Sequence, residues 1–118
     1  TFFSNYSTTD VKISAPGAIG NDGLTSSYFG SSYKAFQGTS MSAPLVSGAA
    51  AMAIGFLKSQ GVPWTPKLIE DLFANGSIED ANLSQSFVNG RRLHLPTLMK
   101  TLSQTYFYDG TGGFNETP

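Results

Sequence analysis

The residues of this chain best suited to chemistry lie in one run, Gly-Thr-Ser-Met-Ser-Ala-Pro at positions 38–44. A serine hydroxyl is a weak nucleophile, so an enzyme must place it well and stabilise the charge that develops on the substrate oxygen. Gly38 permits a tight backbone approach, and an apolar segment typical of a helix follows the run. The N-terminal end of such a helix carries a partial positive charge and free N–H groups. These features meet the positional needs of a serine nucleophile at Ser40, whose own backbone N–H would then be an oxyanion donor.

A serine nucleophile also needs a base and an acid that orients the base. The only acidic residues before Ser40 are Asp10 and Asp22, and the only histidine, His94, follows the serine. We interpret His94 as a structural residue in the turn before the last expected helix. The absence of cysteine excludes disulfides, zinc-thiolate sites and cysteine nucleophiles.

Composition predicts one small folded domain without a nucleic-acid or membrane partner. The chain has 118 residues, of which 40% are hydrophobic and 13% charged, unlike a disordered protein. A net charge of -1 excludes a strong field toward nucleic acid or anionic membranes, and we interpret Arg91-Arg92 as a solvated turn. The apolar run at 43–57 is shorter than the roughly twenty residues that span a bilayer.

Two strands are predicted before the serine. Residues 10–15 alternate polar and apolar side chains, as in a half-buried strand, and Pro16-Gly17 ends this strand. Residues 18–32 are rich in Gly, Ser and Asn and predict a surface loop or a loose hairpin. A second strand at 33–37 then delivers the chain into Gly38.

Three helices are predicted after the strands. The first runs from near Ser40 to about Gln60, with Thr39 or Ser40 as cap, Pro44 in its first turn and Gly61 at its end. Its middle is apolar on nearly all sides, so we expect it to be buried within something larger.

The second helix starts at Thr65-Pro66 and ends near Asn75-Gly76, and a last helix spans about 95–102 with Pro96 in its opening turn. The second helix has an apolar stripe on one face, made of Leu68, Ile69, Leu72 and Phe73.

Gly-Thr-Ser alone is more often a turn with a helix cap than a catalytic site, but the wider pattern resembles one family. Residues 38–44, with Val46 and the Gly-Ala-Ala at 48–50, closely resemble the active-site serine segment of subtilisin-like serine proteases (peptidase S8). Four flanking segments resemble other segments of that family in consistent order, from residue 2 to about 102: Phe-Ser-Asn at 3–5, Ala-Pro-Gly at 15–17, Trp-Thr-Pro at 64–66 and Gly-Arg-Arg-Leu at 90–93.

The resemblance implies an α/β fold class, with residues 1–102 as the C-terminal part of a three-layer catalytic domain that has a mostly parallel sheet. Residues 103–118, which include a Gly-rich stretch, are then a linker or the start of a following module.

The resemblance also implies residue roles in a serine endopeptidase. Ser40 would attack the scissile carbonyl of a polypeptide substrate and form an acyl-enzyme, and Gly38 and Thr39 would shape the oxyanion pocket. Met41 would lie beside the nucleophile, so its oxidation would impair activity. Gln37 would contact substrate on the leaving-group side. Leu45 departs from the family, which usually has a histidine there, and we expect the change to affect packing only.

The family's catalytic Asp and His precede its serine, so we expect them in the N-terminal part of the same protease, on a separate chain or missing segment. The 118 residues alone would then be inactive. No cofactor is expected, structural calcium elsewhere in the whole enzyme is compatible with the family, and localisation is expected to be secreted or extracytoplasmic.

Two alternatives remain open at this point. One is a non-catalytic pseudoprotease or scaffold that kept the serine segment. The other is a sedolisin-type acid peptidase, whose serine motif also begins Gly-Thr-Ser, although the Met-Ser-Ala-Pro continuation at 41–44 resembles subtilisins better.

Overall fold

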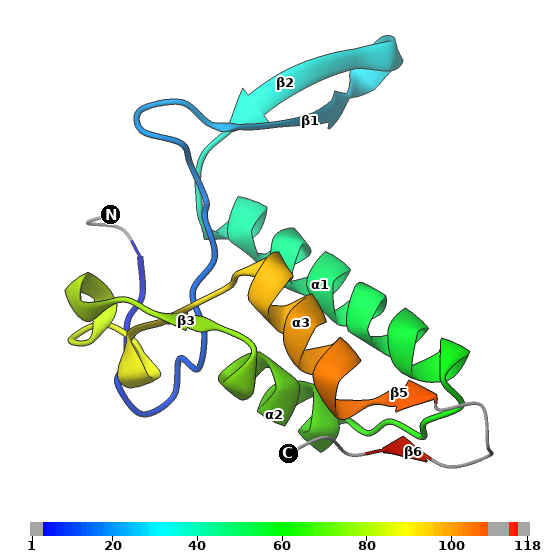
Figure 1. The fold of residues 1–118 in the computed structure, drawn as a ribbon. Helices are drawn as coiled ribbons and strands as arrows, with labels where there is room; N and C mark the ends of the chain where they lie inside the picture. Colours follow the sequence, from blue (N-terminus) through cyan, green and yellow to red (C-terminus); the bar gives the residue numbers. More distant parts are fainter. Residues whose placement is uncertain (1–3, 109–113, 116–118) are drawn as a thin grey trace.

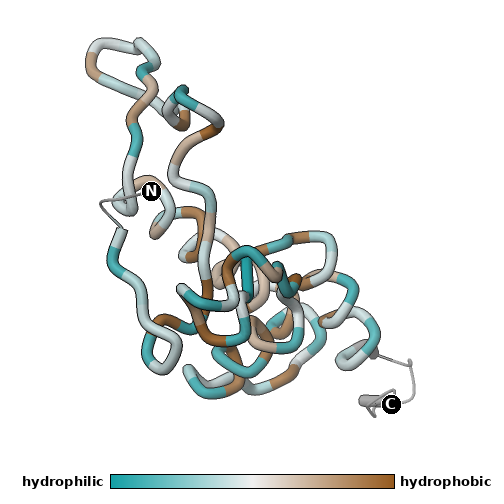
Figure 2. Tube along the Cα trace, turned by 90° about the vertical axis from the view of Figure 1, so that its left-hand side faces the viewer, coloured by the Kyte–Doolittle hydropathy of each residue, from teal (hydrophilic) through white to brown (hydrophobic). Residues whose placement is uncertain are grey.

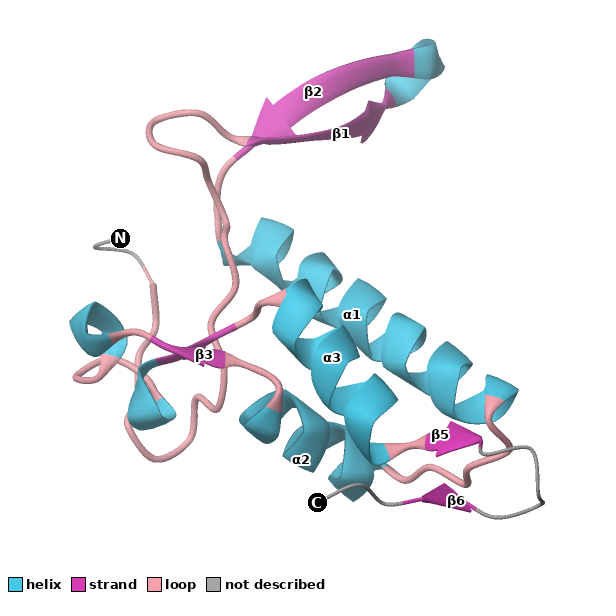
Figure 3. Cartoon of the chain, in the orientation of Figure 1, coloured by secondary structure: helices cyan, strands magenta, loops and turns pink. Residues whose placement is uncertain are grey.

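A body of three helices and a projecting hairpin make up most of the computed structural model, which describes residues 4–108 and 114–115 (Figure 1). A largely irregular segment leads from residue 4 to the hairpin (Figure 3). The elements, in chain order, are β1 (Leu24–Tyr28), η1 (Phe29–Ser31), β2 (Ser32–Phe36), α1 (Thr39–Ser59), α2 (Pro66–Asn75), β3 (Ile78–Glu79), η2 (Ala81–Leu83), η3 (Val88–Gly90), β4 (Arg91–Arg92), α3 (Leu95–Thr105), β5 (Phe107–Tyr108) and β6 (Phe114–Asn115).

The core lies where the three helices meet. Buried residues of α1 recur every four positions, as one stripe of a helix requires, and they pack with the apolar faces of α2 and α3. The core consists of Ala49, Ala53, Leu57, Ile69, Leu72, Phe73, Leu98 and Leu102. Full burial of a leucine side chain contributes about 1.5–3 kcal/mol, so Leu57, Leu98 and Leu102 are its main contributors.

The helix α1 confirms the predicted position but not the predicted cap. Its N-cap is Gly38, with a φ of 138°, and no side chain caps it. Thr39 and Ser40 already lie inside the helix, so neither has the extended backbone from which a side chain caps. At the other end Gly61 has a φ of 71°, and the N–H of Val62 donates to the Leu57 carbonyl at 2.9 Å. This is a glycine-terminated helix end, as predicted.

The other two helices also follow their sequence signals. The Thr65 Oγ1 accepts a hydrogen bond from the Leu68 N–H at 3.1 Å, and Pro66 is the first residue of α2. Of the predicted stripe, Ile69, Leu72 and Phe73 are buried and Leu68 is partly buried. The helix α3 extends three residues beyond the predicted end at 102, to Thr105.

The strands form three two-stranded antiparallel sheets, so the described residues are mixed helix and short strands, compatible with an α/β class. The predicted strand at 33–37 is confirmed as β2, and the segment 18–32 contains its hairpin partner β1. The predicted strand at 10–15 is not continuous. Its one bridge joins Ser14 to Arg92 in parallel, and Ser7 bridges Phe87 in the same sense. A ladder needs a partner along the whole strand, which these two isolated bridges do not supply.

The described part of the chain leaves much of α1 uncovered. Only Ala49, Ala53 and Leu57 of its 21 residues are buried, while Leu45 and Met52 are exposed. The radius of gyration is 16.5 Å, against about 13.5 Å for a compact domain of this length. By length and composition α1 is the one described helix that could cross a membrane, a test that core helices also pass.

Candidate active site

Ser40 is the second residue of α1 and its side chain is exposed. The strand β2 leads into Gln37 and Gly38, and the positive φ of Gly38, 138°, turns the chain from the strand into the helix. Glycine adopts this backbone conformation at little steric cost, whereas a residue with a side chain rarely does. Two residues after this turn, Ser40 lies within the first turn of a 21-residue helix, at its positive end.

Pro44, predicted in the first turn, is the sixth residue of the helix. Proline has no N–H, so the carbonyl of Ser40 lacks the donor that position 44 would otherwise supply. The N–H of Met41 donates to the Gly38 carbonyl at 3.0 Å, which closes the first turn around Ser40. The backbone on both sides of the serine is therefore tightly defined.

Gly17, which the sequence identified as a strand end and as part of the Ala-Pro-Gly segment at 15–17, packs directly on this turn. Its carbonyl accepts a hydrogen bond from the Gly38 N–H at 3.0 Å. A Cβ atom at position 17 would lie 2.6 Å from both the Gly38 carbonyl oxygen and the Ser42 Oγ. Only a glycine fits this contact, and the sequence signals at this position, the Pro16-Gly17 dipeptide and the Ala-Pro-Gly segment at 15–17, did not specify the contact with Gly38.

The other predicted site residues surround Ser40 in different ways. Thr39 is exposed, Met41 is half-buried, and Gln37 is exposed with its Nε2 donating to the Asn21 carbonyl at 2.7 Å. Gln37 and Gly38 thus both contact the loop that precedes β1. All five predicted residues, 37–41, lie in one continuous stretch, so their proximity follows from the sequence itself.

A cavity of about 730 Å³ lies beside the start of α1. One wall comes from α1, with its N-cap Gly38 beside it, and consists of Thr39, Ser42, Ala43 and Val46. The opposite walls come from the N-terminal segment around Val11–Gly17 and from the region of Leu83–Leu93, and Arg92 is their one charged lining residue. Most of the lining is apolar, which suits the packing of further polypeptide more than the binding of a charged ligand.

His94 has a structural task at the start of α3. It is the N-cap residue of that helix, and its Nδ1 accepts the Thr97 N–H at 3.3 Å and lies 2.7 Å from the Thr97 Oγ1. The ring nitrogen that a catalytic acid would orient, Nδ1, is thereby engaged in a local cap. This arrangement agrees with interpreting His94 as structural.

The two acidic residues before the serine are engaged in turns. Hydrogen bonds from the Ser7 hydroxyl and then the Thr9 hydroxyl lower the pKa of Asp10, and each hydroxyl lies 2.9 Å from its Oδ2. Asp22 pairs with Ile19 across a tight turn through backbone hydrogen bonds. Among residues 4–108 and 114–115, no three His, Cys, Asp or Glu side chains gather as a metal site would require.

The described residues therefore hold an exposed serine hydroxyl in the first turn of a long helix, and His94, which caps α3, is not placed beside it as a base. Residues 1–90 match the model of the subtilase family, Peptidase_S8. No curated protein matches the chain.

Proposed function

This chain belongs to the subtilase family of serine proteases, and from that premise we propose that it carries the nucleophile of a subtilisin-like serine endopeptidase. The single observation that carries the proposal is the placement of Ser40. It lies exposed in the first turn of α1, directly after a glycine turn whose Gly38 N–H donates to the Gly17 carbonyl.

In the proposed reaction the Ser40 Oγ attacks the carbonyl carbon of a polypeptide substrate. A histidine base takes the hydroxyl proton, the Oγ–C bond forms, and the carbonyl oxygen becomes an oxyanion. The Ser40 N–H, at the positive end of α1, stabilises this oxyanion, and Thr39 shapes the space around it. The C–N bond then breaks as the amine leaves with the proton. Water hydrolyses the acyl-enzyme and regenerates Ser40.

We propose that the catalytic Asp and His lie in the N-terminal part of the same protease, outside these 118 residues. Three features support this proposal: the engagement of His94 in a helix cap, the uncovered side of α1, and the mostly apolar cavity beside the nucleophile turn. The same features support a larger catalytic domain in which a mostly parallel sheet and a further layer pack on α1. The 118 residues alone are then inactive.

Family membership supports secretion or another location outside the cytoplasm, and the reaction needs no cofactor. Calcium in the whole enzyme would be structural. A polypeptide is the proposed substrate, with neither nucleic acid nor membrane as partner.

The experiment is active-site labelling of the whole protease with a fluorophosphonate probe. We expect the probe to label Ser40 in the whole protease, and Ser40→Ala to abolish both labelling and peptide hydrolysis. The 118 residues alone are expected to remain unlabelled until the N-terminal part is added. Hydrolysis by Ser40→Ala at the wild-type rate would overturn the proposal.

One observation favours the second candidate, a non-catalytic subtilase-like scaffold: the described residues bring no base to Ser40. The same labelling separates the two. A folded whole protein that neither reacts with the probe nor hydrolyses peptides is the scaffold.

A further inference from the structure

Residues 17–22 form a tight turn, named here the brace turn, just before the hairpin. The Ile19 N–H donates to the Asp22 carbonyl at 2.8 Å, and the Asp22 N–H donates back to the Ile19 carbonyl at 2.9 Å. Gly20 and Asn21 occupy the two positions between them, and Gly20 has a φ of 60°. A two-residue turn with a glycine in the left-handed region is a stable way to reverse the chain. The brace turn is therefore closed by two hydrogen bonds of its own.

The brace turn contacts the chain directly before Ser40 at two points. The Gly17 carbonyl accepts the Gly38 N–H at 3.0 Å, and the Asn21 carbonyl accepts the Gln37 Nε2–H at 2.7 Å. Just beyond the turn, a Cβ atom at Gly23 would lie 2.5 Å from the Phe36 nitrogen. Three consecutive residues, 36–38, are thus held from one side.

The backbone of the brace turn packs closely against the chain around Ser40, residues 38–42. A Cβ at Gly17 would lie 2.6 Å from the Gly38 carbonyl oxygen, the same oxygen that accepts the Met41 N–H. It would also lie 2.6 Å from the Ser42 Oγ, on the other side of Ser40 in the sequence. A displacement of the brace turn is therefore transmitted to both sides of Ser40.

We propose that the brace turn sets the position of the Ser40 hydroxyl and that Gln37 is the positioning residue that ties this turn to the nucleophile. The inference rests on the function proposed for Ser40. A misplacement on the order of 1 Å at a reacting atom costs about 10²-fold in rate, so Gln37 affects catalysis without touching substrate. This role differs from the direct substrate contact that the family resemblance implied for the same residue.

The test compares two exposed glutamines in the whole protease. Gln37→Met keeps the length of the side chain and removes the donor to Asn21, and Gln104→Met makes the same change on α3. We expect Gln37→Met to lower kcat about three- to tenfold with KM unchanged. We also expect faster hydrogen exchange at the Gly38 amide, and an unfolding midpoint equal to that of Gln104→Met.

Two results would overturn the proposal. A higher KM with kcat unchanged would assign Gln37 to substrate binding. Kinetic constants of Gln37→Met equal to those of Gln104→Met would show that the brace turn does not affect the position of the Ser40 hydroxyl. Gly17→Ala is the second variant, and we expect it to lower kcat more than Gln37→Met. If Gly17→Ala does not fold, the comparison of Gln37→Met with Gln104→Met tests the proposal by itself.

Failure of the proposed function has a different signature. If the fluorophosphonate probe does not label wild-type Ser40, the assignment of a nucleophile fails and kcat has no meaning. Hydrogen exchange at the Gly38 amide then tests by itself whether Gln37 ties the brace turn to the chain before Ser40. Faster exchange in Gln37→Met than in Gln104→Met supports this link, and equal exchange overturns it.

Discussion

Met41 follows the proposed nucleophile directly, and its side chain is half-buried. Oxidation converts its thioether into a larger, polar sulfoxide, which disturbs the packing beside Ser40. We expect hydrogen peroxide to inactivate the whole protease and Met41→Leu to protect it. The measurement is residual peptide hydrolysis after a timed peroxide exposure.

Met52 provides the matched control because it lies on the same helix, about three turns beyond Ser40. Met52→Leu removes a methionine but leaves Met41 in place, so we expect the variant to remain peroxide-sensitive. Equal rates of inactivation in Met41→Leu and wild type would exclude Met41 as the sensitive residue.

At the residue scale, contacts between distant parts of the chain could not be predicted from the sequence. The turn at Gly38 and the helix start at Ser40 could be predicted because both depend on adjacent positions in the chain. The contact between Gly17 and Gly38 joins residues far apart in sequence, and no local pattern encodes a close approach of two backbones. The bond from Gln37 to Asn21 was missed for the same reason.

Among the elements, α2 was predicted most fully because each of its signals is local. Thr65, Pro66 and the apolar stripe all lie within the helix or at its start. The strand expected at 10–15 was predicted less well, since a strand is completed by partners that its own sequence does not specify. The prediction that Thr39 or Ser40 caps α1 was wrong, because the N-cap is Gly38 and a glycine N-cap has no side chain that could identify it.

The cap of α2 gives a prediction at this scale. Thr65→Ala removes the acceptor of the Leu68 N–H, and we expect it to lower the free energy of unfolding of the whole protease by about 0.5–2 kcal/mol. The measurement is denaturant unfolding followed by circular dichroism.

Thr65→Ser keeps the hydroxyl oxygen and is the control for this change. We expect its stability to stay within a few tenths of a kcal/mol of wild type. A loss in Thr65→Ser as large as that in Thr65→Ala would mean that the Thr65 methyl group, not the cap, provides the stability.

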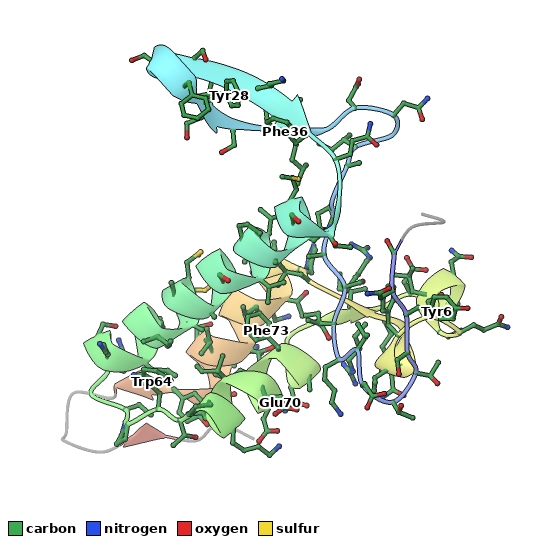
Figure 4. The ribbon with its side chains drawn as sticks, turned by 180° about the vertical axis from the view of Figure 1, so that it is seen from behind. Tyr6, Tyr28, Phe36, Trp64, Glu70 and Phe73 are labelled. Carbon is green, nitrogen blue, oxygen red and sulfur yellow. The ribbon has the colours of Figure 1, made fainter. Side chains whose placement is uncertain are left out.

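At the scale of the whole molecule, apolar side chains remain uncovered on the hairpin and on α1. Phe29 is 83% exposed and Tyr33 75% exposed, on the arm formed by β1 and β2. Figure 2 shows hydrophobic segments on this projecting arm as well as in the helical body. Tyr28 and Phe36 lie along the arm in Figure 4, and the Lys34 ammonium lies 5.1 Å from each ring centroid. These exposed apolar side chains support the proposal that further protein packs against the hairpin and α1.

This gives a prediction for the whole protease. If the N-terminal part covers the free side of α1, Met52 becomes buried there, and Met52→Asp places an unpaired charge in an apolar interface. We expect Met52→Asp to lower the free energy of unfolding by about 2–5 kcal/mol and Met52→Leu to change it by less than about 1.5 kcal/mol. A loss below about 0.5 kcal/mol in Met52→Asp, typical of an exposed site, would contradict coverage of α1.

The bond from the Ser14 hydroxyl to the Arg91 carbonyl spans 77 positions of the sequence, and it has a consequence for the time course of biosynthesis. At about 5–20 residues per second, roughly 4–15 s separate the synthesis of the two partners on the ribosome. During that interval the segment 10–15 has no partner at 87–92, while the local turns of α1 form in microseconds or less. The segment 10–15 therefore stays without its partner until after α1 and α2 have been synthesised, and a nascent chain would expose this segment throughout that interval.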